Sequence, residues 1–468
     1  MDPELERNLI DAAWAALCTA DEAAADARPD VEVAGAGGGL PSAFPVEETA
    51  VACVSAALMA AAALDRTRGG ATGPVALDRG HVTAAVRSER YFRRGTEAAG
   101  GGFAPLSRFW PTADGWVRTH ANYPWHRAAL LSALGTSGDA TDLGEAMAER
   151  PAQEIEEVVV AAGGIAAAVR TAAEWRRHAQ RQAVLAEPLI GHRLAGEAAP
   201  RARPPGRLPA AGVRVLDLTR VIAGPVCTRF LAALGADVVR LDPPQRPDMG
   251  AGTVADTLLG KRSALMDLAS PGSDKALHNL LDGADVVVCG YRPGALDRFG
   301  LDEEMLATRH PGVVVVFLDA WGHTGPWAGR RGFDSVVQAP TGIATGESSD
   351  GVSPGALPCQ LLDHGTGYLA AAAALDGLRR QGQQGGTHVR RLSLARTAAW
   401  LTSGPRQPGG PASGAPGVED ASAWVVALDS ADGPVTAVRP PGALGGRPLQ
   451  WPSLVTGYGN DAPAWGTP

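Results

Sequence analysis

The stretch that decides the fold is RVLDLTRVIAGPVCTRFLAALGADVVRLDPP, residues 214–244. It predicts a strand over 213–218, a helix over 225–234 that Gly235 stops, and a second strand over 237–241. The loop 220–225 then lies at the carboxyl end of the first strand. Ligands bind at this edge of an open parallel sheet, and the free amides of a helix start suit a phosphate or carboxylate. No GxGxxG follows the strand, so a dinucleotide fingerprint is lacking.

Short apolar runs continue to alternate with helical patterns up to about residue 403. Helices are predicted over 274–281 and 365–379, and strands over 285–289 and 313–319. Strands that are apolar throughout and interleave with helices indicate a parallel sheet covered on both faces. We therefore expect an α/β fold with a doubly wound, Rossmann-like sheet.

Three stretches rich in Gly, Pro and Ala interrupt the hydrophobic pattern, at 31–45, 197–211 and 404–418. Such composition without periodicity is typical of linkers and mobile loops. They divide the chain into three parts. A length of 468 residues is enough for two or more domains.

Composition narrows the possible partners. The net charge of −8 and the pI near 5.7 disfavour a nucleic-acid binder, which needs a basic face. The five cysteines are odd in number, scattered and without a C-x-x-C pair, so we expect no disulfide framework, no metal site and a reducing compartment.

The chain start and its most apolar stretch both bear on location. The start, MDPELERNLIDAA, is acidic where a secretory signal is basic. The longest apolar stretch, 49–64, is shorter than a membrane span and is predicted to be a buried helix. We expect a cytoplasmic protein with no membrane partner.

Residues 51–85 resemble residues 362–400 within the same chain. Both segments have an Ala-rich helix that ends in Leu-Asp, a Gly-rich turn, a short strand and another helix, with Leu64-Asp65 aligned to Leu375-Asp376. Chance is the competing explanation, because alanine is the commonest helix former. The shared order favours an internal repeat.

Five motifs resemble a known family. They are 214–244 as quoted above, GKRSALMDL (260–268), ADVVVCGYRPGALDRFGLD (284–302), HPGVVVVFLDAWGHTGPWAGRRGFDSVVQAPTG (310–342) and LLDHGTGYLAAAAAL (361–375). In this order and spacing they closely resemble the class III coenzyme A transferases, the carnitine and bile-acid-inducible (CaiB/BaiF) family. The resemblance implies that family's fold, with a large Rossmann-like domain and a smaller α+β domain.

The flanks resemble the family more weakly and in a permuted or fused order. Segments 107–135 and 170–190 are similar to the small domain, which in the family follows the large domain, and 422–462 is similar to the segment that returns to it. Family members form interlocked dimers, which implies a homodimer. The implied organisation is an N-terminal helix and Gly-rich linker (1–45), a partial copy with the small domain (46–200), the coenzyme A-binding domain (208–403), a flexible linker (404–421) and a C-terminal return segment (422–468).

The resemblance assigns the chemistry to Asp363. In the family this aspartate attacks an acyl-CoA thioester to give a mixed anhydride, then an aspartyl-CoA thioester, and so moves coenzyme A to a small carboxylic acid. A carboxylate is ionised at neutral pH and splits one transfer into easier steps. The competing structural interpretation is that Asp363 only caps the helix predicted over 365–379. In the repeat, Ala52 stands opposite Asp363, so the first copy is expected to be chemically silent.

The resemblance also implies the coenzyme A contacts. Arg298 and Arg331 are the expected phosphate partners, because guanidinium presents paired donors to phosphate oxygens. Pro243 stands where many members have a basic residue. The full set of expected contacts is Val221, Ile222, Ala223, Met266, Asp267, Leu268, Gly290, Tyr291, Arg292, Arg298 and Arg331. His323, His364 and His388 are expected in turns or on the surface, and Cys289 and Cys359 as packed apolar residues.

Two other functions remain open. The same family fold hosts alpha-methylacyl-CoA racemases, in which a histidine moves the α proton, but Phe333 stands at that position and phenylalanine cannot transfer a proton. A catalytically silent coenzyme A-binding member is the third possibility. Retention of Asp363 favours the transferase.

Overall fold

The large sheet of the computed structural model has seven strands. The structure describes residues 2–18, 28–37, 39–71, 73–95, 97–98, 102–248, 255–407, 421–430, 433–452 and 454–466. Across the sheet the strands are β11 (Arg262–Leu265), β10 (Asp237–Asp242), β9 (Arg214–Leu218), β12 (Val286–Cys289), β13 (Val314–Asp319), β14 (Thr387–Ser393) and β8 (Gly191–Gly196). All neighbours are parallel except β8, which pairs antiparallel with β14. The chain therefore reverses its direction across the sheet between β9 and β12, where α/β sheets form a crevice for ligands.

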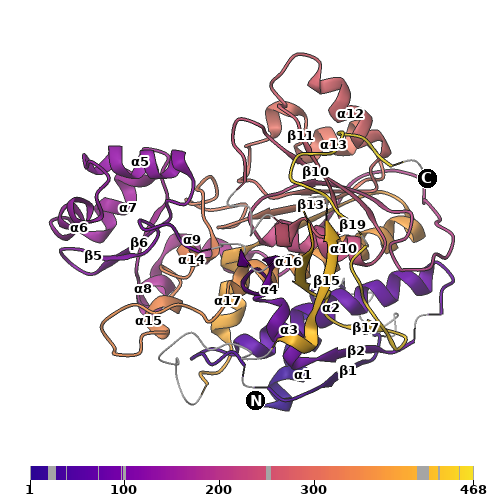
Figure 1. Cartoon of the computed structure of the whole chain (residues 1–468), viewed down its shortest axis with the longest axis horizontal. Coiled ribbons are helices and arrows are strands. Elements are labelled where there is room, and N and C mark those ends of the chain that lie inside the picture. The colour runs from indigo at the N-terminus through magenta and orange to yellow at the C-terminus, as the bar shows by residue number, and fades with distance from the viewer. Residues whose placement is uncertain are drawn as a thin grey trace.

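Helices cover both faces of this sheet (Figure 1). α12 (Ser273–Gly283) and α13 (Glu303–Arg309) cover one face, and α10 (Ala223–Ala233) and α16 (Leu361–Gln384) cover the other, with α2 (Val46–Thr67) packed against α16. The run Val286–Cys289 shows why the strands are apolar throughout. Val286 and Val288 join the core beneath α10 and α16, while Val287 joins the core beneath α12. The predicted α/β architecture is thus confirmed, with a parallel sheet at its centre.

α2 packs along α16, and the segments that follow the two helices share one order of elements. α2 leads into β2 (Val75–Asp78) and α3 (Arg79–Ala85), as α16 leads into β14 and α17 (Leu394–Ser403). Asp78 accepts a hydrogen bond from the His81 amide at the start of α3, and Ser393 accepts one from the Arg396 amide at the start of α17. The helix, strand and helix predicted for both segments are present.

α2 is buried in the protein. Within the described part of the chain it is the one helix long and apolar enough to cross a membrane, and 94% of its most apolar window is buried inside the structure. Ala52, the residue opposite Asp363 in the repeat, lies in this helix and is fully buried. The predicted buried helix over 49–64 is confirmed.

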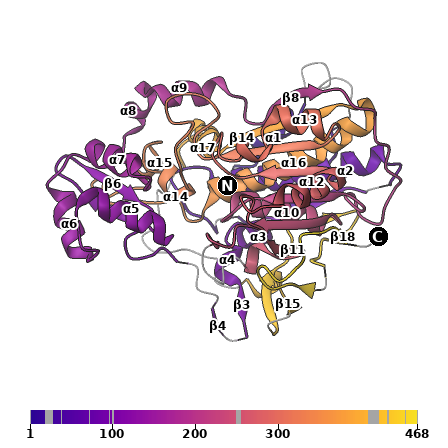
Figure 2. The same ribbon diagram turned by 90° about the horizontal axis from the view of Figure 1, so that it is seen from above.

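A smaller unit lies beside the large sheet in both views (Figures 1 and 2). Its antiparallel sheet has β5 (Phe109–Pro111), β6 (Trp116–Thr119) and β7 (Ala166–Ala168). Its helices are α5 (Pro124–Leu134), α6 (Ala140–Ala148), α7 (Ala152–Ala161), α8 (Ala172–Arg177) and α9 (Ala179–Ala186). Trp110, Val117, Leu130, Leu143 and Ile155 form a separate core. After this unit the chain returns to the large sheet as β8.

Two further sheets complete the described part. One has β1 (Val31–Ala34), β2, β17 (Ala443–Leu444) and β18 (Arg447–Pro448), and the other β19 (Leu454–Val455), β15 (Val425–Ser430), β16 (Val435–Val438), β3 (Arg93–Arg94) and β4 (Glu97–Ala98). The prediction of a linker throughout 31–45 was wrong at Val31–Ala34, because these residues pair in register with Val75–Asp78. Residues 408–420 of the predicted linker 404–421 lie outside the described residues. The remaining helices are α1 (Pro3–Ala15), α4 (Ser88–Tyr91), α14 (Asp334–Val337) and α15 (Ile343–Gly346), with 3-10 turns at Asp297–Phe299 and Ser422–Trp424.

Candidate active site

The loop after β9 is held in a strained conformation. Val221 has φ of 67°, the one left-handed backbone among the described residues other than glycine, and a β-branched residue there is an outlier that marks functional sites. The Val221 amide donates to Asp248 Oδ2 at 3.1 Å. α10 begins at Ala223 without a side-chain cap, so its first amides are available to an anion. A Cβ on Gly224 would lie 2.3 Å from Cβ of Thr219, which explains glycine at that position.

A buried ion pair fixes the base of this loop. Lys261 Nζ lies 2.9 Å from Asp217 Oδ2, and both side chains are fully buried. Asp217 also accepts from the Thr219 amide at 3.0 Å and from Thr228 Oγ1 at 2.5 Å. Burial alone would raise the pKa of Asp217, but the charge of Lys261 and these hydrogen bonds hold it below its usual value. Burial lowers the pKa of Lys261 to about 8, so the pair is charged at neutral pH.

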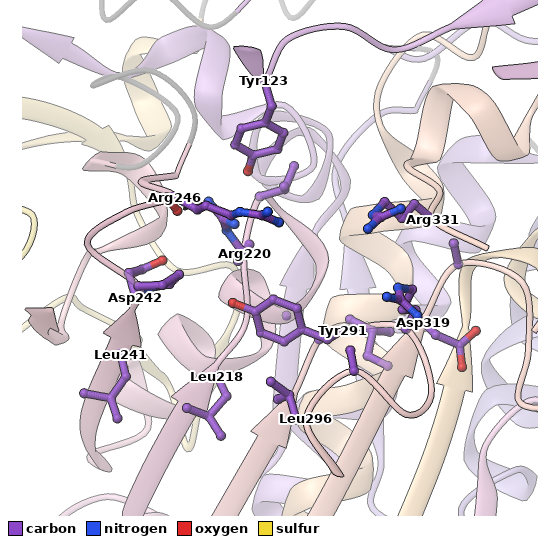
Figure 3. Close-up of a pocket in the computed structure, with 18 of the residues that line it drawn as sticks. Tyr123, Leu218, Arg220, Leu241, Asp242, Arg246, Tyr291, Leu296, Asp319 and Arg331 are labelled. Atoms are coloured by element: carbon purple, nitrogen blue, oxygen red, sulfur yellow. Dashed lines mark hydrogen bonds between the residues drawn. The ribbon is translucent and has the colours of Figure 1, made fainter. Parts of the chain in front are cut away.

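A cavity of about 730 Å³ opens at the carboxyl ends of β9, β10, β12 and β13 (Figure 3). The structure brings eleven of the twelve predicted site residues to its wall: Val221, Ala223, Met266, Asp267, Leu268, Gly290, Tyr291, Arg292, Arg298, Arg331 and Asp363. Ile222 is the exception, because its side chain belongs to the core beneath the sheet.

The cavity wall is rich in arginine although the whole chain carries a net charge of −8. In Figure 3, Arg220 and Arg246 face Arg331 across the cavity. Burial, and then the charges of Arg292 and Arg246, lower the pKa of Arg331. Six arginines line the cavity: Arg220, Arg246, Arg292, Arg298, Arg330 and Arg331. Such a concentration of guanidinium groups is suited to bind the phosphate groups of a large anionic ligand.

The small unit closes one side of this cavity with side chains that were not among the predicted site residues. Tyr123, Trp125 and His126 line it together with the loops of the large sheet. The Tyr123 hydroxyl donates a short hydrogen bond to Asp248. The Arg220 guanidinium lies over the rings of Tyr123 and Trp125, 5.0 and 5.7 Å from their centroids. The Arg220 side chain thus joins the two units. In the sequence, the aromatic residues of NYPW (122–125) were the available sign that the small unit contributes to the cavity wall.

Asp363 lies in the first turn of α16 and is only 5% exposed. The helix begins at Leu361, with Gln360 at the cap position and no side-chain capping bond, so the interpretation of Asp363 as a helix cap was wrong. The Asp363 amide donates to Asp334 Oδ2 at 3.0 Å, and Gln338 Nε2 donates to Asp334 Oδ1 at 2.5 Å. Within the described residues, no hydrogen bond is formed by the Asp363 carboxyl group itself.

Burial decides the charge state of this pair of carboxyl groups. Burial, followed by the charges of Asp334 and Glu89, raises the pKa of Asp363 well above its usual value. Burial also raises the pKa of Asp334 to about 6. Glu89 differs, because the hydrogen bond from His364 at 3.1 Å and the charge of His364 outweigh burial and lower its pKa. Two neighbouring buried carboxyl groups therefore resist ionising together.

The histidine prediction was wrong at two of three positions. His364 and His388 are buried. His388 lies in β14, and its ring hydrogen-bonds to the carbonyl oxygen of Gly385, just before the strand, at 2.9 Å. His323 does lie in a half-buried turn, 3.2 Å from Asp319. Cys289 and Cys359 are packed in the core as predicted, and burial raises the pKa of the Cys289 thiol to about 12. No cluster of three or more metal-ligating side chains occurs among the residues that the structure describes.

Sequence comparison agrees with this geometry. Residues 210–440 match the sequence pattern of CoA-transferase family III. This part of the chain belongs to that family. An acyl-CoA transferase of Gibberella moniliformis is 32% identical over 310 residues, which are 60% of this chain and 54% of the relative. A probable fatty acyl-CoA transferase of Mycobacterium tuberculosis is 32% identical over 206 residues, 41% of this chain and 52% of the relative.

A formyl-CoA:oxalate CoA-transferase of Rhodopseudomonas palustris is 32% identical over 178 residues, 36% of this chain and 42% of the relative. The chain thus spans about half the length of the curated relatives it matches. A crystal structure of the Mycobacterium tuberculosis protein aligns with 42% of this chain and 56% of its own, at 32% identity and a TM-score of 0.40.

Proposed function

We propose that this chain is an acyl-CoA:carboxylate CoA-transferase whose nucleophile is Asp363. The observation that carries the proposal is a buried carboxyl group, free of hydrogen bonds within the described residues, at the wall of a cavity lined by six arginines. The arginines match the phosphates of coenzyme A, and the carboxylate can accept an acyl group. The names of the relatives, which describe acyl-CoA and formyl-CoA transfer, support the same activity.

The transfer balances in four steps. Asp363 first releases its proton to solvent; the carboxylate then attacks the thioester carbonyl and the C–S bond breaks, which gives a mixed anhydride and the coenzyme A thiolate. The thiolate attacks the aspartyl carbonyl and releases the donor acid, leaving an aspartyl-CoA thioester. The acceptor carboxylate then attacks this thioester, and the thiolate leaves again. Finally the thiolate attacks the acceptor acyl carbon, which forms the new thioester and restores Asp363.

Burial of Asp363 favours this sequence in two ways. An ionised Asp363 is poorly solvated and lies near Asp334, so its charged form is destabilised in the ground state. Acylation removes that charge, and the repulsion between the two carboxylates disappears in both covalent intermediates. Interactions that improve on the way to the intermediate lower the barrier.

The arginines and the loop after β9 would hold coenzyme A. Arg298 and Arg331 are proposed to bind the phosphate oxygens of coenzyme A. Met266–Leu268 and Gly290–Arg292 would contact the rest of the coenzyme A molecule. Val221 and Ala223 line the cavity, and the Ala223 amide at the start of α10 would contribute a donor, since the Val221 amide is already bonded to Asp248. Because the Ile222 side chain lies in the core, its proposed contact is through the backbone.

The remaining parts of the proposal concern architecture and context. The strand order and the helices on both faces support assigning the doubly wound, Rossmann-like type to the large domain. Relatives named for succinate, malate and oxalate support a small carboxylic acid as partner substrate. A homodimer and a cytoplasmic location stay predictions, as do the domain limits.

Racemisation remains the second candidate because of one observation. Phe333 occupies the position expected for a racemase histidine, but His126 lines the cavity and its ring lies 6.1 Å from that of Phe333. Burial lowers the pKa of His126 to about 4, so its imidazole is neutral and able to take a proton. Stereospecific exchange of the α proton of a 2-methylacyl thioester in deuterated water, at the rate of turnover, would reverse the ranking.

The test of the proposed function is direct transfer. The protein is incubated with acetyl-CoA or succinyl-CoA and a panel of carboxylic acids, and new thioesters are detected by mass spectrometry. We expect transfer that Asp363→Asn abolishes, while Asp274→Asn, whose side chain is 81% exposed on α12, retains it. Coenzyme A should still bind to Asp363→Asn. Full activity in Asp363→Asn, or no transfer to any acid by the unmodified protein, would refute the proposal.

A further inference from the structure

Arg118 is a buried cation that has no hydrogen-bond or ion-pair partner among the described residues. It lies on β6, where Val117 and Thr119 face the core of the small unit. Because side chains alternate along a strand, Arg118 faces the other side of the sheet, against which α14 packs. The residue is 6% exposed, and no hydrogen bond or ion pair is formed by its guanidinium within the described residues.

Other deeply buried arginines of this protein are paired. Arg229 lies 2.6 Å from Asp256, and Arg240 lies 2.7 Å from Asp242. The Arg118 guanidinium instead lies 4.5 Å from the ring centroid of Phe103 and 5.0 Å from that of Phe109. Rings attract a cation, but they accept none of the five N–H donors of the guanidinium group. A buried charge without a partner is costly, so a ligand is the natural explanation of its presence.

Asp334 connects Arg118 to the candidate active site. Burial lowers the pKa of Arg118 to about 10 in spite of the opposing charge of Asp334, so Arg118 is still a cation at neutral pH. The two oxygens of Asp334 already accept bonds from Gln338 and from the amide of Asp363. Asp334 thus lies close enough to influence Arg118 electrostatically but does not satisfy its donors.

Two imidazoles of the same segment also have unsatisfied nitrogens. Nδ1 of His120 and Nδ1 of His126 are enclosed and lack hydrogen-bond partners within the described residues. The His120 ring lies 4.0 Å from the ring of Phe333, which lines the cavity, and His126 lines the cavity itself. Burial lowers both pKa values, to about 3 for His120 and about 4 for His126, so both rings are neutral and can each donate one bond.

We propose that Arg118 binds a carboxylate group of the acid substrate, one other than the carboxylate that reacts with Asp363. The guanidinium fork matches a carboxylate in two parallel hydrogen bonds, and the unsatisfied Nδ1 of His126 would donate a third. The acid would then carry two carboxylates, with its body against Phe333. This inference rests on the proposed function, because that function supplies the acid substrate.

Binding and turnover together test the inference. Glutarate carries a second carboxylate in place of one terminal hydrogen of butyrate, and the binding of both acids is measured by calorimetry in the presence of coenzyme A. Arg118→Met should weaken glutarate binding at least tenfold and leave butyrate binding unchanged, with partial recovery in Arg118→Lys. Arg108→Met is the control, because Arg108 is exposed and also lies over a ring, 4.3 Å from the centroid of Trp110. In turnover, the KM for the dicarboxylic acid should rise while the KM for acyl-CoA stays constant.

The outcomes separate the two proposals. Equal loss of glutarate and butyrate binding, or no loss of either, would overturn the role of Arg118, even if coenzyme A transfer proceeds normally. Selective loss of glutarate binding in a protein that transfers nothing would support Arg118 and refute the transferase. If Arg118→Met does not fold, Arg118→Lys decides the matter, because a shorter, single-point cation should still weaken glutarate selectively.

Discussion

Replacement of Asp363 by asparagine should make the protein more stable at neutral pH while it removes transfer. An unfolded aspartate ionises near pH 4, whereas burial and Asp334 raise the pKa of Asp363 well above that value in the folded state. Between these two pKa values the folded state binds more protons than the unfolded state. The free energy of unfolding of the original protein therefore falls as pH rises, by at most about 1.4 kcal/mol for each pH unit.

The asparagine variant has no carboxyl group at this position, so its free energy of unfolding does not fall with rising pH for this reason. Its carboxamide is nearly the same size, and the original carboxyl group makes no hydrogen bond within the described residues that the change would break. At pH 8 we expect the free energy of unfolding of the variant to exceed that of the original protein by about 1.4 kcal/mol or more, because each pKa unit corresponds to about 1.4 kcal/mol. Near pH 4 the two should be equally stable.

Urea unfolding at pH 4, 5, 6, 7 and 8, followed by circular dichroism, measures this difference. Asp274→Asn is the control and should show at most a small trend with pH, because its side chain is 81% exposed and its contact with His278, at 3.2 Å, is screened by solvent. A stability difference for Asp363→Asn that does not change with pH, or a variant less stable than the original at pH 8, would contradict the reasoning. Such a result would mean that Asp363 is solvated or paired rather than held as a destabilised carboxyl group.

Three further predictions concern the supports of the site. Lys261→Met should lower the free energy of unfolding by about 3–5 kcal/mol in urea titrations, because it leaves Asp217 buried and unpaired; a loss below 1 kcal/mol would show that water replaces the lysine. Val221→Gly should raise stability by about 1 kcal/mol, because strain of about 1–3 kcal/mol is relieved against a smaller entropic loss; a lower melting temperature would argue against strain. Arg298→Ala should weaken coenzyme A binding about tenfold and reduce its salt dependence in calorimetry; unchanged affinity would place the phosphates elsewhere.

Local pattern was sufficient to predict the inner strands of the large sheet, but the two edge strands, β8 and β11, were not predicted. Val286–Cys289 is apolar on both faces, which only a strand between two helix layers explains, and the structure has helices on both sides. The start of α16 was predicted too late, at residue 365 instead of Leu361. The two glycines and the threonine in 365–367 obscured the pattern, and the helix is fixed there by burial of Leu361 and Leu362 against the core.

The other half of the site could not be predicted from local pattern. Tyr123, which lines the cavity, and Arg118, whose pKa is influenced by the charge of Asp334, belong to a unit far from Asp363 in sequence, and only tertiary packing brings the two units together. Nothing in the letters distinguishes Arg118 from an exposed arginine, because its significance lies in burial without a partner. For the same reason His364 was expected at the surface, whereas it is buried beside Glu89, which is remote in the chain.

The central claim is that one aspartate of this chain forms a covalent bond to the substrate, and covalent trapping tests it most directly. The protein is incubated with an acyl-CoA, treated with borohydride or hydroxylamine, digested and analysed by mass spectrometry. We expect one modified aspartate per chain, at Asp363, and no modification in Asp363→Asn. Labelling at a different residue, or turnover without any trapped adduct in a variant that lacks Asp363, would contradict the account.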